Sequence, residues 1–332
     1  MNTPQREKRF ALAAILLGTV IALAIAELGL RLADIEYSAY PTRFQFGWPD
    51  SKTLDTDFVM DPLIQWKPKE YDKTLQDWKG RRIDVLHMGD SCTQLGNYAG
   101  ELNRLMQQRQ PALNFRNLKL GVAGWSSWQG LQQLQRDVVP LEPRYVTIYF
   151  GWNDHWLSYG LPDKQIDFSK ARFPLYRTLQ QSRVFQVFSF FYNRMLQGES
   201  AAERPLRVPP EDFRHNLREM VRIARENGIA PILLTAPSSH RPGSEPQYLQ
   251  DRFLEDLDQL VPLHNQYMAI VREVAKEQDV LLLDLQAEFE VMPYATVRDE
   301  YMKADGIHWK PAGSTAVAES LYRFLNEKRL LD

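Results

Sequence analysis

Short apolar runs alternate with amphipathic stretches from Arg82 to the C-terminus. Five runs predict buried strands, at 83–88, 115–120, 145–150, 232–234 and 280–283. Apolar residues at helical spacing predict helices near 98–109, 125–138, 211–227, 262–278 and 312–327. Short apolar strands that alternate with helices indicate a parallel sheet covered by helices on both faces.

The first part of the chain follows a different pattern. No charge interrupts the sequence from Phe10 to Ala26, and Arg6, Lys8 and Arg9 precede it. A bilayer-spanning helix needs about 20 apolar residues, with roughly 17 as the lower limit. The basic flank predicts a cytoplasmic N-terminus and an extracytoplasmic remainder.

Two interpretations of this apolar segment compete. It is either an uncleaved signal anchor or a signal peptide that is cut after Ala26, where Ala24-Ile25-Ala26 has a small-x-small form. The run is longer than the usual h-region of about 7–15 residues, and apolar residues continue beyond Glu27. We therefore favour the anchor, and keep export after cleavage near Ala26 as the alternative.

The patterns divide the chain into three regions. Residues 1–32 form a basic cytoplasmic tip and a transmembrane anchor, 33–80 a linker and lead-in segment, and 81–330 one α/β domain. A stretch at about 158–210 does not follow the strand–helix rhythm, so we expect an insertion there. Its aromatic run suits an element that shapes substrate access or meets the membrane surface.

Composition narrows the classes of function. Apolar residues make up 44% and charged residues 25% of the 332, which is ordinary for a globular protein. The net charge of −2 gives no reason to expect nucleic acid as a partner. The single cysteine, Cys92, excludes an intramolecular disulfide and zinc sites built from several cysteines. No metal, nucleotide or dinucleotide motif occurs, so we expect no cofactor.

The residues that suggest chemistry stand at the ends of the predicted strands. Ser91 follows the first strand within Gly-Asp-Ser, Gly124 follows the second, and Asn153 follows the third. Asp305 and His308 form an Asp-x-x-His pair just before the last helix. Ligands of open α/β sheets bind outside the carboxyl ends of the strands, so this placement predicts a shared site.

These blocks, in this order, resemble the SGNH (GDSL-type) hydrolase family, in a membrane-anchored bacterial form. The resemblance covers roughly residues 80 to 330, apart from the insertion. It implies a three-layer α/β/α flavodoxin-like fold with a central parallel five-stranded sheet. The strand order 2-1-3-4-5 is implied by the resemblance and by the strand–helix pattern alike.

The resemblance also implies a role for each block. Ser91 is expected to be the nucleophile, His308 its general base, and Asp305 the carboxylate that orients the imidazole. The oxyanion hole is expected to combine the backbone N–H groups of Ser91 and Gly124 with the side-chain amide of Asn153. Gly-x-Ser-x-Gly is absent around the serine, which argues against the α/β-hydrolase nucleophile elbow.

Several of these residues have ordinary alternatives. Asp90 is expected to stabilise the turn and not to act in catalysis. Gly121 lies in the same loop as Gly124, which fits the family pattern better. Four further alternatives involve other side chains: a loop pair or helix cap at Asn153-Asp154, a surface position for His308, a packed core position for His87, and a buried inert thiol at Cys92.

Aromatic residues gather beside the catalytic blocks. The candidates for substrate binding are Trp125, Trp128, Trp152, His155, Trp156 and Trp309. Exposed aromatic rings suit stacking on a sugar or gripping an acyl chain. The alternative is that they fill space beneath surface loops, and that His155 is a solvated loop histidine.

The sequence thus predicts an extracytoplasmic serine esterase held at the cytoplasmic membrane. It is expected to cleave O-acyl esters, with an O-acetylated glycan as the first candidate, through an acyl-Ser91 intermediate. Its predicted partners are a small-molecule or glycan ester and the membrane. Two alternatives remain open: an O-acetyltransferase acting on cell-envelope or exopolysaccharide sugars, and a non-catalytic glycan-binding or assembly protein.

Overall fold

A computed structural model describes residues 3–35, 57–158, 162–166, 178–179, 181–196, 205–250 and 253–331. The chain forms two compact units. The smaller comprises Met1–Arg43 and Ser169–Glu203, and the larger comprises Phe44–Phe168 and Arg204–Asp332. Much of the predicted linker, residues 36–56, and parts of the predicted insertion lie outside the described residues.

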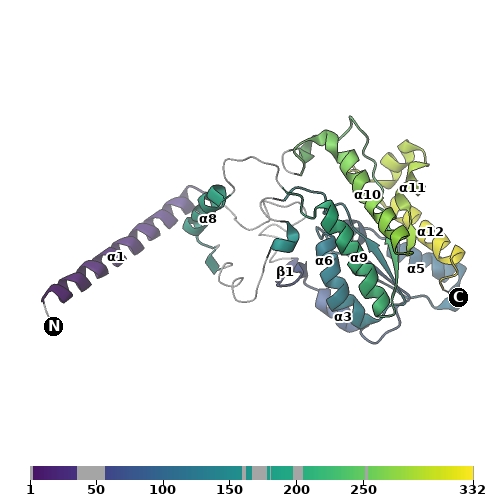
Figure 1. The fold of residues 1–332 in the computed structure, drawn as a ribbon, viewed down its shortest axis with the longest axis horizontal. Helices are drawn as coiled ribbons and strands as arrows, with labels where there is room; N and C mark the ends of the chain where they lie inside the picture. The colour runs from purple at the N-terminus through teal and green to yellow at the C-terminus, as the bar shows by residue number, and fades with distance from the viewer. Residues whose placement is uncertain are drawn as a thin grey trace. The chain divides into compact units, whose positions relative to one another are not determined.

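The larger unit is built on a five-stranded parallel sheet (Figure 1). Its strands are β3 (Val85–Gly89), β4 (Asn117–Lys119), β5 (Tyr145–Tyr149), β6 (Ala230–Leu234) and β7 (Leu281–Leu283). Their spatial order is β4-β3-β5-β6-β7, and every neighbouring pair is parallel. This confirms the predicted flavodoxin-like order, and the five runs lie within one or two residues of the observed strands.

Helices flank the sheet in two groups. Helices α5 (Tyr98–Arg109) and α12 (Pro311–Glu327) pack against each other. Helix α9 (Pro210–Glu226) contacts both α6 (Ser127–Gln133) and α10 (Leu260–Glu277). The result is the predicted helix–sheet–helix layering (Figure 1).

Local sequence signals explain where these helices begin and end. Ser126 and Gln129 form a capping box at the start of α6, which satisfies backbone donors that a helix leaves free. The predicted helix at 125–138 is α-helical only over α6, and the chain continues from there as a π-helix over Leu134–Val138. Gly228 follows α9 with a φ of 71°, as expected for a glycine that ends a helix.

The lead-in segment before the sheet is part of the larger unit from residue 57 onward. Strands β1 (Phe58–Asp61) and β2 (Gln65–Pro68) form an antiparallel hairpin, followed by α3 (Tyr71–Trp78). Trp66 is fully buried, and its Nε1 donates to the carbonyl of Ala123 at 3.2 Å. Trp125 donates in return to the Trp66 carbonyl at 2.9 Å, so the hairpin supports the loop that follows β4.

The two ends of the insertion are fastened to each other within the larger unit. The Ser158 N–H donates to the Pro205 carbonyl at 2.6 Å. A fully buried ion pair joins Arg207 to Asp163 at 2.8 Å, and the Ser126 hydroxyl donates to the same carboxylate at 2.7 Å. A buried charge is costly unless it is paired and hydrogen-bonded, and here both conditions hold.

The smaller unit pairs two helices. Helix α1 (Thr3–Leu32) contacts α8 (Arg183–Leu196), which comes from the insertion. The helical segment Lys8–Leu32 is long and apolar enough to cross a membrane, and none of its most apolar stretch is buried. An exposed apolar helix near the N-terminus fits a membrane anchor or a signal sequence, and does not fit the core helix of a soluble domain.

Candidate active site

The turn after β3 presents Ser91 at the carboxyl edge of the sheet. Strand β3 ends at Gly89, and the short helix α4 (Ser91–Leu95) begins at the serine. Asp90 is the N-cap residue, and its Oδ1 accepts from the Cys92 N–H at 2.8 Å. Because the first N–H groups of a helix have no intrahelical acceptor, the Ser91 N–H is available to a ligand.

The loop before α12 brings His308 and Asp305 to this serine. His308 Nε2 lies 2.8 Å from Ser91 Oγ, and His308 Nδ1 lies 2.7 Å from Asp305 Oδ2. A carboxylate accepts the Nδ1 proton, which leaves the Nε2 lone pair directed at the serine hydroxyl. The structure therefore joins the three predicted residues in one hydrogen-bonded chain.

The Asp305 carboxylate is held in its charged form. Its Oδ1 accepts from the N–H groups of Ile307 and His308, both at 2.9 Å. Partial burial raises the pKa of Asp305, but the hydrogen bonds from the His308 ring and from the two backbone N–H groups outweigh it. The net effect lowers the pKa of Asp305 to about 2, so the side chain is a carboxylate at neutral pH.

Two of the predicted oxyanion-hole residues, Asn153 and Gly124, lie in loops that a hydrogen bond joins. Asn153 follows β5, is buried, and donates from Nδ2 to the Trp125 carbonyl at 3.0 Å. An amide nitrogen has two N–H bonds, so one remains for a ligand. Gly124 has a φ of 80°, a conformation that glycine adopts without strain.

The loop of Gly124 is also tied directly to the nucleophile turn. The Val122 N–H donates to the Gly89 carbonyl at 2.9 Å, and the Ala123 N–H donates to Gln94 Oε1 at 2.6 Å. Gly121 has a packing role, because a Cβ there would lie 2.5 Å from the Thr93 Cβ. The choice of Gly124 over Gly121 as the oxyanion-hole residue stays a prediction.

With this geometry in place, comparison with known proteins is informative. Residues 87–316 match the GDSL-like lipase/acylhydrolase family. The chain belongs to this family. It is therefore an ester hydrolase by family, and the predicted resemblance is confirmed.

Individual relatives of this GDSL-like hydrolase are distant. The uncharacterized lipoprotein YqeF of Bacillus subtilis is 25% identical over 256 residues, which are 72% of this chain and 87% of the relative. The lipase/acylhydrolase of Enterococcus faecalis is 17% identical with a TM-score of 0.47, over 74% of this chain and 97% of that one. Axe2, an acetylxylan esterase of Geobacillus stearothermophilus, is 20% identical with a TM-score of 0.46, over 73% and 93% of the two chains.

The aromatic residues of the hydrolase are not the exposed rim that we expected. Trp128 is partly exposed, whereas the others are buried: Trp125, Trp152, His155, Trp156 and Trp309. Trp152 stacks on His264 with ring centroids 3.9 Å apart. Burial corrects the stacking prediction for these five side chains, and it also rules out a solvated position for His155. They fill the space beneath the loops at the strand ends.

Two other predicted positions agree with the structure. His87 is fully buried in β3, where its Nδ1 lies 2.9 Å from Thr147 Oγ1. Cys92 is fully buried, and burial raises the pKa of its thiol well above the ordinary value. A thiol held in its protonated form is a poor nucleophile, which fits an inert role.

A histidine that the sequence did not single out supports the Asp-His loop of the hydrolase. His240 Nε2 donates to the Asp305 carbonyl at 2.8 Å, and the Ser238 hydroxyl lies 3.0 Å from His240 Nδ1. The Ser239 N–H donates to the Gly306 carbonyl at 3.1 Å. Gly306 has a φ of 71°, and a Cβ there would lie 2.5 Å from His240 Nε2. The loop after β6 therefore holds the Asp305–His308 turn at two points.

One signal could have identified His240. It follows the fourth predicted strand in Ser-Ser-His, so it shares the carboxyl edge with the other site residues. Burial lowers the pKa of His240, which keeps the ring neutral with one donor and one acceptor nitrogen.

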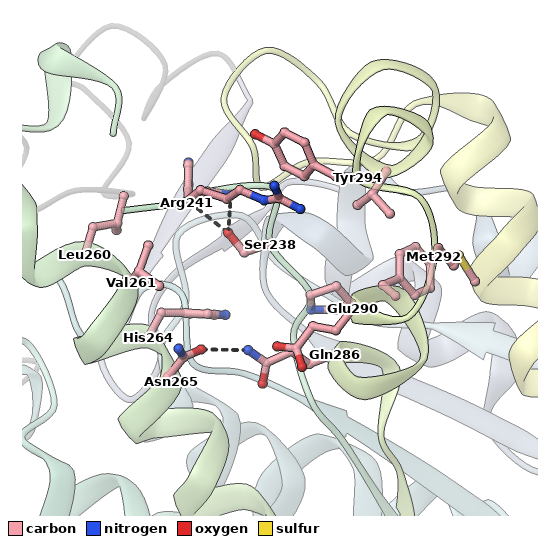
Figure 2. Close-up of a pocket in the computed structure, with 14 residues that line it drawn as sticks. Ser238, Arg241, Leu260, Val261, His264, Asn265, Gln286, Glu290, Met292 and Tyr294 are labelled. Atoms are coloured by element: carbon pink, nitrogen blue, oxygen red, sulfur yellow. Dashed lines mark hydrogen bonds between the residues drawn. The ribbon is translucent and has the colours of Figure 1, made fainter. Parts of the chain in front are cut away.

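His240 also lines a cavity of about 150 Å³, which Figure 2 shows. Arg241 and Tyr294 stand at one side of it and Asn265 with Gln286 at the other, as Figure 2 shows. None of the residues of the Ser91 site is among the described residues that line this cavity.

Proposed function

We propose that this hydrolase cleaves O-acyl esters through an acyl-enzyme on Ser91. The observation that carries the proposal is the continuous hydrogen-bonded chain from Asp305 through His308 to Ser91, with contacts of 2.7 and 2.8 Å. A serine hydroxyl needs such an oriented base to become a nucleophile at neutral pH.

The reaction runs in two halves. His308 Nε2 takes the proton as Ser91 Oγ attacks the ester carbonyl, and the resulting oxyanion accepts from the N–H groups of Ser91 and Gly124 and from Asn153 Nδ2. The imidazolium, held by Asp305, then gives its proton to the departing alcohol. His308 deprotonates a water that attacks the acyl-enzyme, and the imidazolium then returns this proton to Ser91 Oγ as the acid is released.

We propose a short acyl group, with O-acetylated glycans as the first natural substrates to test. The support is the expected position of the domain outside the cytoplasmic membrane, where glycan esters of the cell envelope are accessible. This orientation follows from the basic residues before the apolar run.

Ester hydrolysis by the full chain in detergent tests the catalytic assignment. We expect Ser91→Ala to reduce the hydrolysis of p-nitrophenyl acetate by about 10⁴-fold or to the reagent background, because no other group replaces the nucleophile. Ser320→Ala is the matched control, since Ser320 lies on α12 and donates to Glu288 instead. Wild-type activity in Ser91→Ala would contradict the proposal.

An ester series tests the substrate class. Acetyl, butyryl and octanoyl p-nitrophenyl esters are compared, followed by an acetylated oligosaccharide with and without an unacetylated acceptor. Release of free acetate, with the highest kcat/KM for acetyl esters, is the expected result. Acetylated acceptor in place of free acetate would identify an acetyltransferase that uses the same residues.

The proposed topology has its own test. Alkaline phosphatase, which is active only outside the cytoplasm, is fused after residue 332. We expect an active fusion, and an inactive fusion together with an active cytoplasmic reporter at the same site would reverse the orientation.

A further inference from the structure

Among the described side chains of helix α8, the two exposed ones are phenylalanines and the two buried ones are polar. Phe188 and Phe191 are 65% and 58% exposed, whereas Gln186 and Ser189 are only 6% and 8% exposed. Residues three apart lie on the same side of a helix, so the two phenylalanines form one outward apolar face. A helix in water normally shows the opposite arrangement, with apolar side chains inward. The arrangement of α8 fits an apolar surrounding.

The start of α8 is fixed to α1 by one carboxylate. Glu27 accepts hydrogen bonds from the backbone N–H groups of Arg183 and Val184, both at 3.0 Å, and from the Ser182 hydroxyl at 2.9 Å. These are donors that a helix N-terminus leaves unsatisfied, and the helix dipole favours a negative charge there. Glu27 therefore acts as a cap for α8 that is supplied by another helix.

An arginine completes this connection. Arg31 Nε donates to Glu27 Oε1 at 2.8 Å, one turn along α1, and Arg31 Nη2 donates to the Gln181 carbonyl at 2.8 Å. The carboxylate thus has a charged partner as well as backbone donors. We refer to Glu27, Arg31 and the start of α8 as the cap junction.

The position of the cap junction along α1 places it at a membrane boundary. The uncharged run from Phe10 to Ala26 spans about 26 Å at the α-helical rise, which is close to the thickness of about 30 Å of a bilayer core. Glu27 follows that run directly. If α1 crosses the membrane, α8 begins where the hydrocarbon ends on the side opposite the N-terminus.

We propose that α8 is a membrane-surface helix that lies in the outer lipid–water interface, with Phe188 and Phe191 inserted among the acyl chains. Its partner is the lipid bilayer. Aromatic side chains on one side of a short helix are typical of interfacial segments. Leu28 and Leu32 of α1 are exposed as well, and α1 contacts α8, which fits a shared apolar surrounding.

This inference rests on the proposed membrane anchoring by α1 and is independent of the ester chemistry. It gives the insertion a role, because α8 is a second attachment to the membrane. It also disfavours cleavage after Ala26, because cleavage would remove the helical body that presents Glu27 to α8.

Site-specific fluorescence on the full chain tests the inference. The single native cysteine, Cys92, is buried, so the environment-sensitive dye NBD can be attached to an introduced cysteine. The variants are Phe188→Cys and Phe191→Cys, with Leu17→Cys on α1 as the anchor reference and Val291→Cys, 87% exposed, as the water reference. Each is reconstituted in nanodiscs of phosphatidylethanolamine and phosphatidylglycerol.

We expect NBD at 188 and 191 to be quenched about twofold or more by lipids that carry a nitroxide near the headgroup, and to resist aqueous iodide, because an interfacial helix buries its apolar face about 5–10 Å deep. NBD at position 291 is expected to show the reverse.

The inference is overturned if iodide quenches NBD at positions 188 and 191 as strongly as at position 291, while nitroxide lipids quench NBD at position 17. If 17 is not quenched by lipid, the anchoring itself fails. Protection that appears only at two chains per disc would identify a second copy as the partner and would also overturn the inference.

The cap junction is tested in the same system. Glu27→Ala removes the acceptor, and we expect iodide quenching of NBD at 188 to rise toward the level at 291. Glu27→Gln keeps one acceptor oxygen, so its iodide quenching of NBD at position 188 should lie between that of the chain with Glu27 and that of Glu27→Ala. Hydrolysis of p-nitrophenyl acetate by each variant shows that the larger unit is folded. Unchanged protection at 188 in Glu27→Ala would contradict the role assigned to Glu27.

Discussion

Two aspartates lie close to Ser91 and His308, Asp90 on the turn after β3 and Asp305 on the loop before α12, and their surroundings differ. Asp90 adjoins Ser91, is fully buried, and accepts from the Cys92 N–H through Oδ1, while its Oδ2 has no hydrogen-bond partner among the described residues. Burial raises the pKa of Asp90 to about 6. Asp305 accepts three hydrogen bonds, and its pKa falls to about 2.

The comparison shows that position in the sequence does not decide which carboxylate serves the histidine. Asp90 is adjacent to the serine, but its single hydrogen bond caps α4. Asp305 receives the imidazole Nδ1 proton and the backbone donors that stabilise a negative charge. Two carboxyl groups whose pKa values are driven apart in this way are typical of a division of roles within one site.

Replacing each aspartate by asparagine is the sharpest way to break this comparison, and Asp305→Asn should have the larger effect. An amide no longer fixes the Nδ1 proton, so His308 loses the tautomer that directs Nε2 at Ser91. We expect kcat for p-nitrophenyl acetate to fall by about 10⁴-fold, as in related triads. Steady-state kinetics measure this, and activity within tenfold of wild type would contradict the role of Asp305.

Removal of the amide at Asn153 should have the next largest effect. Asn153→Ala takes one donor from the oxyanion, and we expect kcat to fall by about 10²- to 10³-fold with little change in KM. Asn153→Asp is the matched control, because it keeps the shape and lacks the donor. A variant pair in which only KM changes would show that Asn153 binds the ground state and does not stabilise the oxyanion.

Loosening the loop that carries Asp305 should lower kcat less than removing the Asp305 carboxylate does. His240→Ala deletes the donor to the Asp305 carbonyl. We expect kcat to fall by about 10- to 100-fold at constant KM, because a small displacement of a catalytic group slows the reaction this much. His240→Gln keeps an N–H near the same place and should recover part of the rate. Equal kcat in wild type and His240→Ala, with only a lower melting temperature, would show a structural role alone.

Asp90→Asn should leave hydrolysis within a few-fold of wild type and change the pH dependence of stability instead. Because the folded-state pKa of Asp90 is raised from 3.8 to about 6, the folded state binds more protons than the unfolded state between these values. The buried carboxyl therefore reduces stability as pH rises through this window. The variant should gain stability relative to wild type above pH 6, and the difference should vanish below about pH 4. Urea unfolding at pH 7 and pH 4 measures it; an equal difference at both would contradict the assignment.

Much of this site follows from the order of residues along the chain. The apolar runs place Ser91, Gly124 and Asn153 at the carboxyl ends of consecutive strands, and parallel strands bring those ends to one edge. A local signal also explains the start of α6, where Ser126 and Gln129 form the capping box.

The features of the site and fold that the sequence does not reveal depend on contacts between distant residues, and such contacts leave no periodic signal. His240 reaches Asp305 across 65 positions, and a single loop histidine carries no pattern that reveals its partner. Composition also cannot decide whether an amphipathic tryptophan faces water or protein, so the sequence leaves both positions open for Trp152, which is buried and stacked on His264. The hairpin at Phe58–Pro68 is stabilised through Trp66, whose partners follow β4.

Covalent labelling of Ser91 tests the central claim most directly. The full chain is treated with a fluorophosphonate, digested, and the Ser91 peptide is quantified by mass spectrometry over time. We predict one phosphonyl adduct per chain on Ser91, absent in Ser91→Ala, strongly slowed in Asp305→Asn and close to wild type in Asp90→Asn. An unmodified Ser91 peptide, or equal labelling rates in the two aspartate variants, would contradict the account.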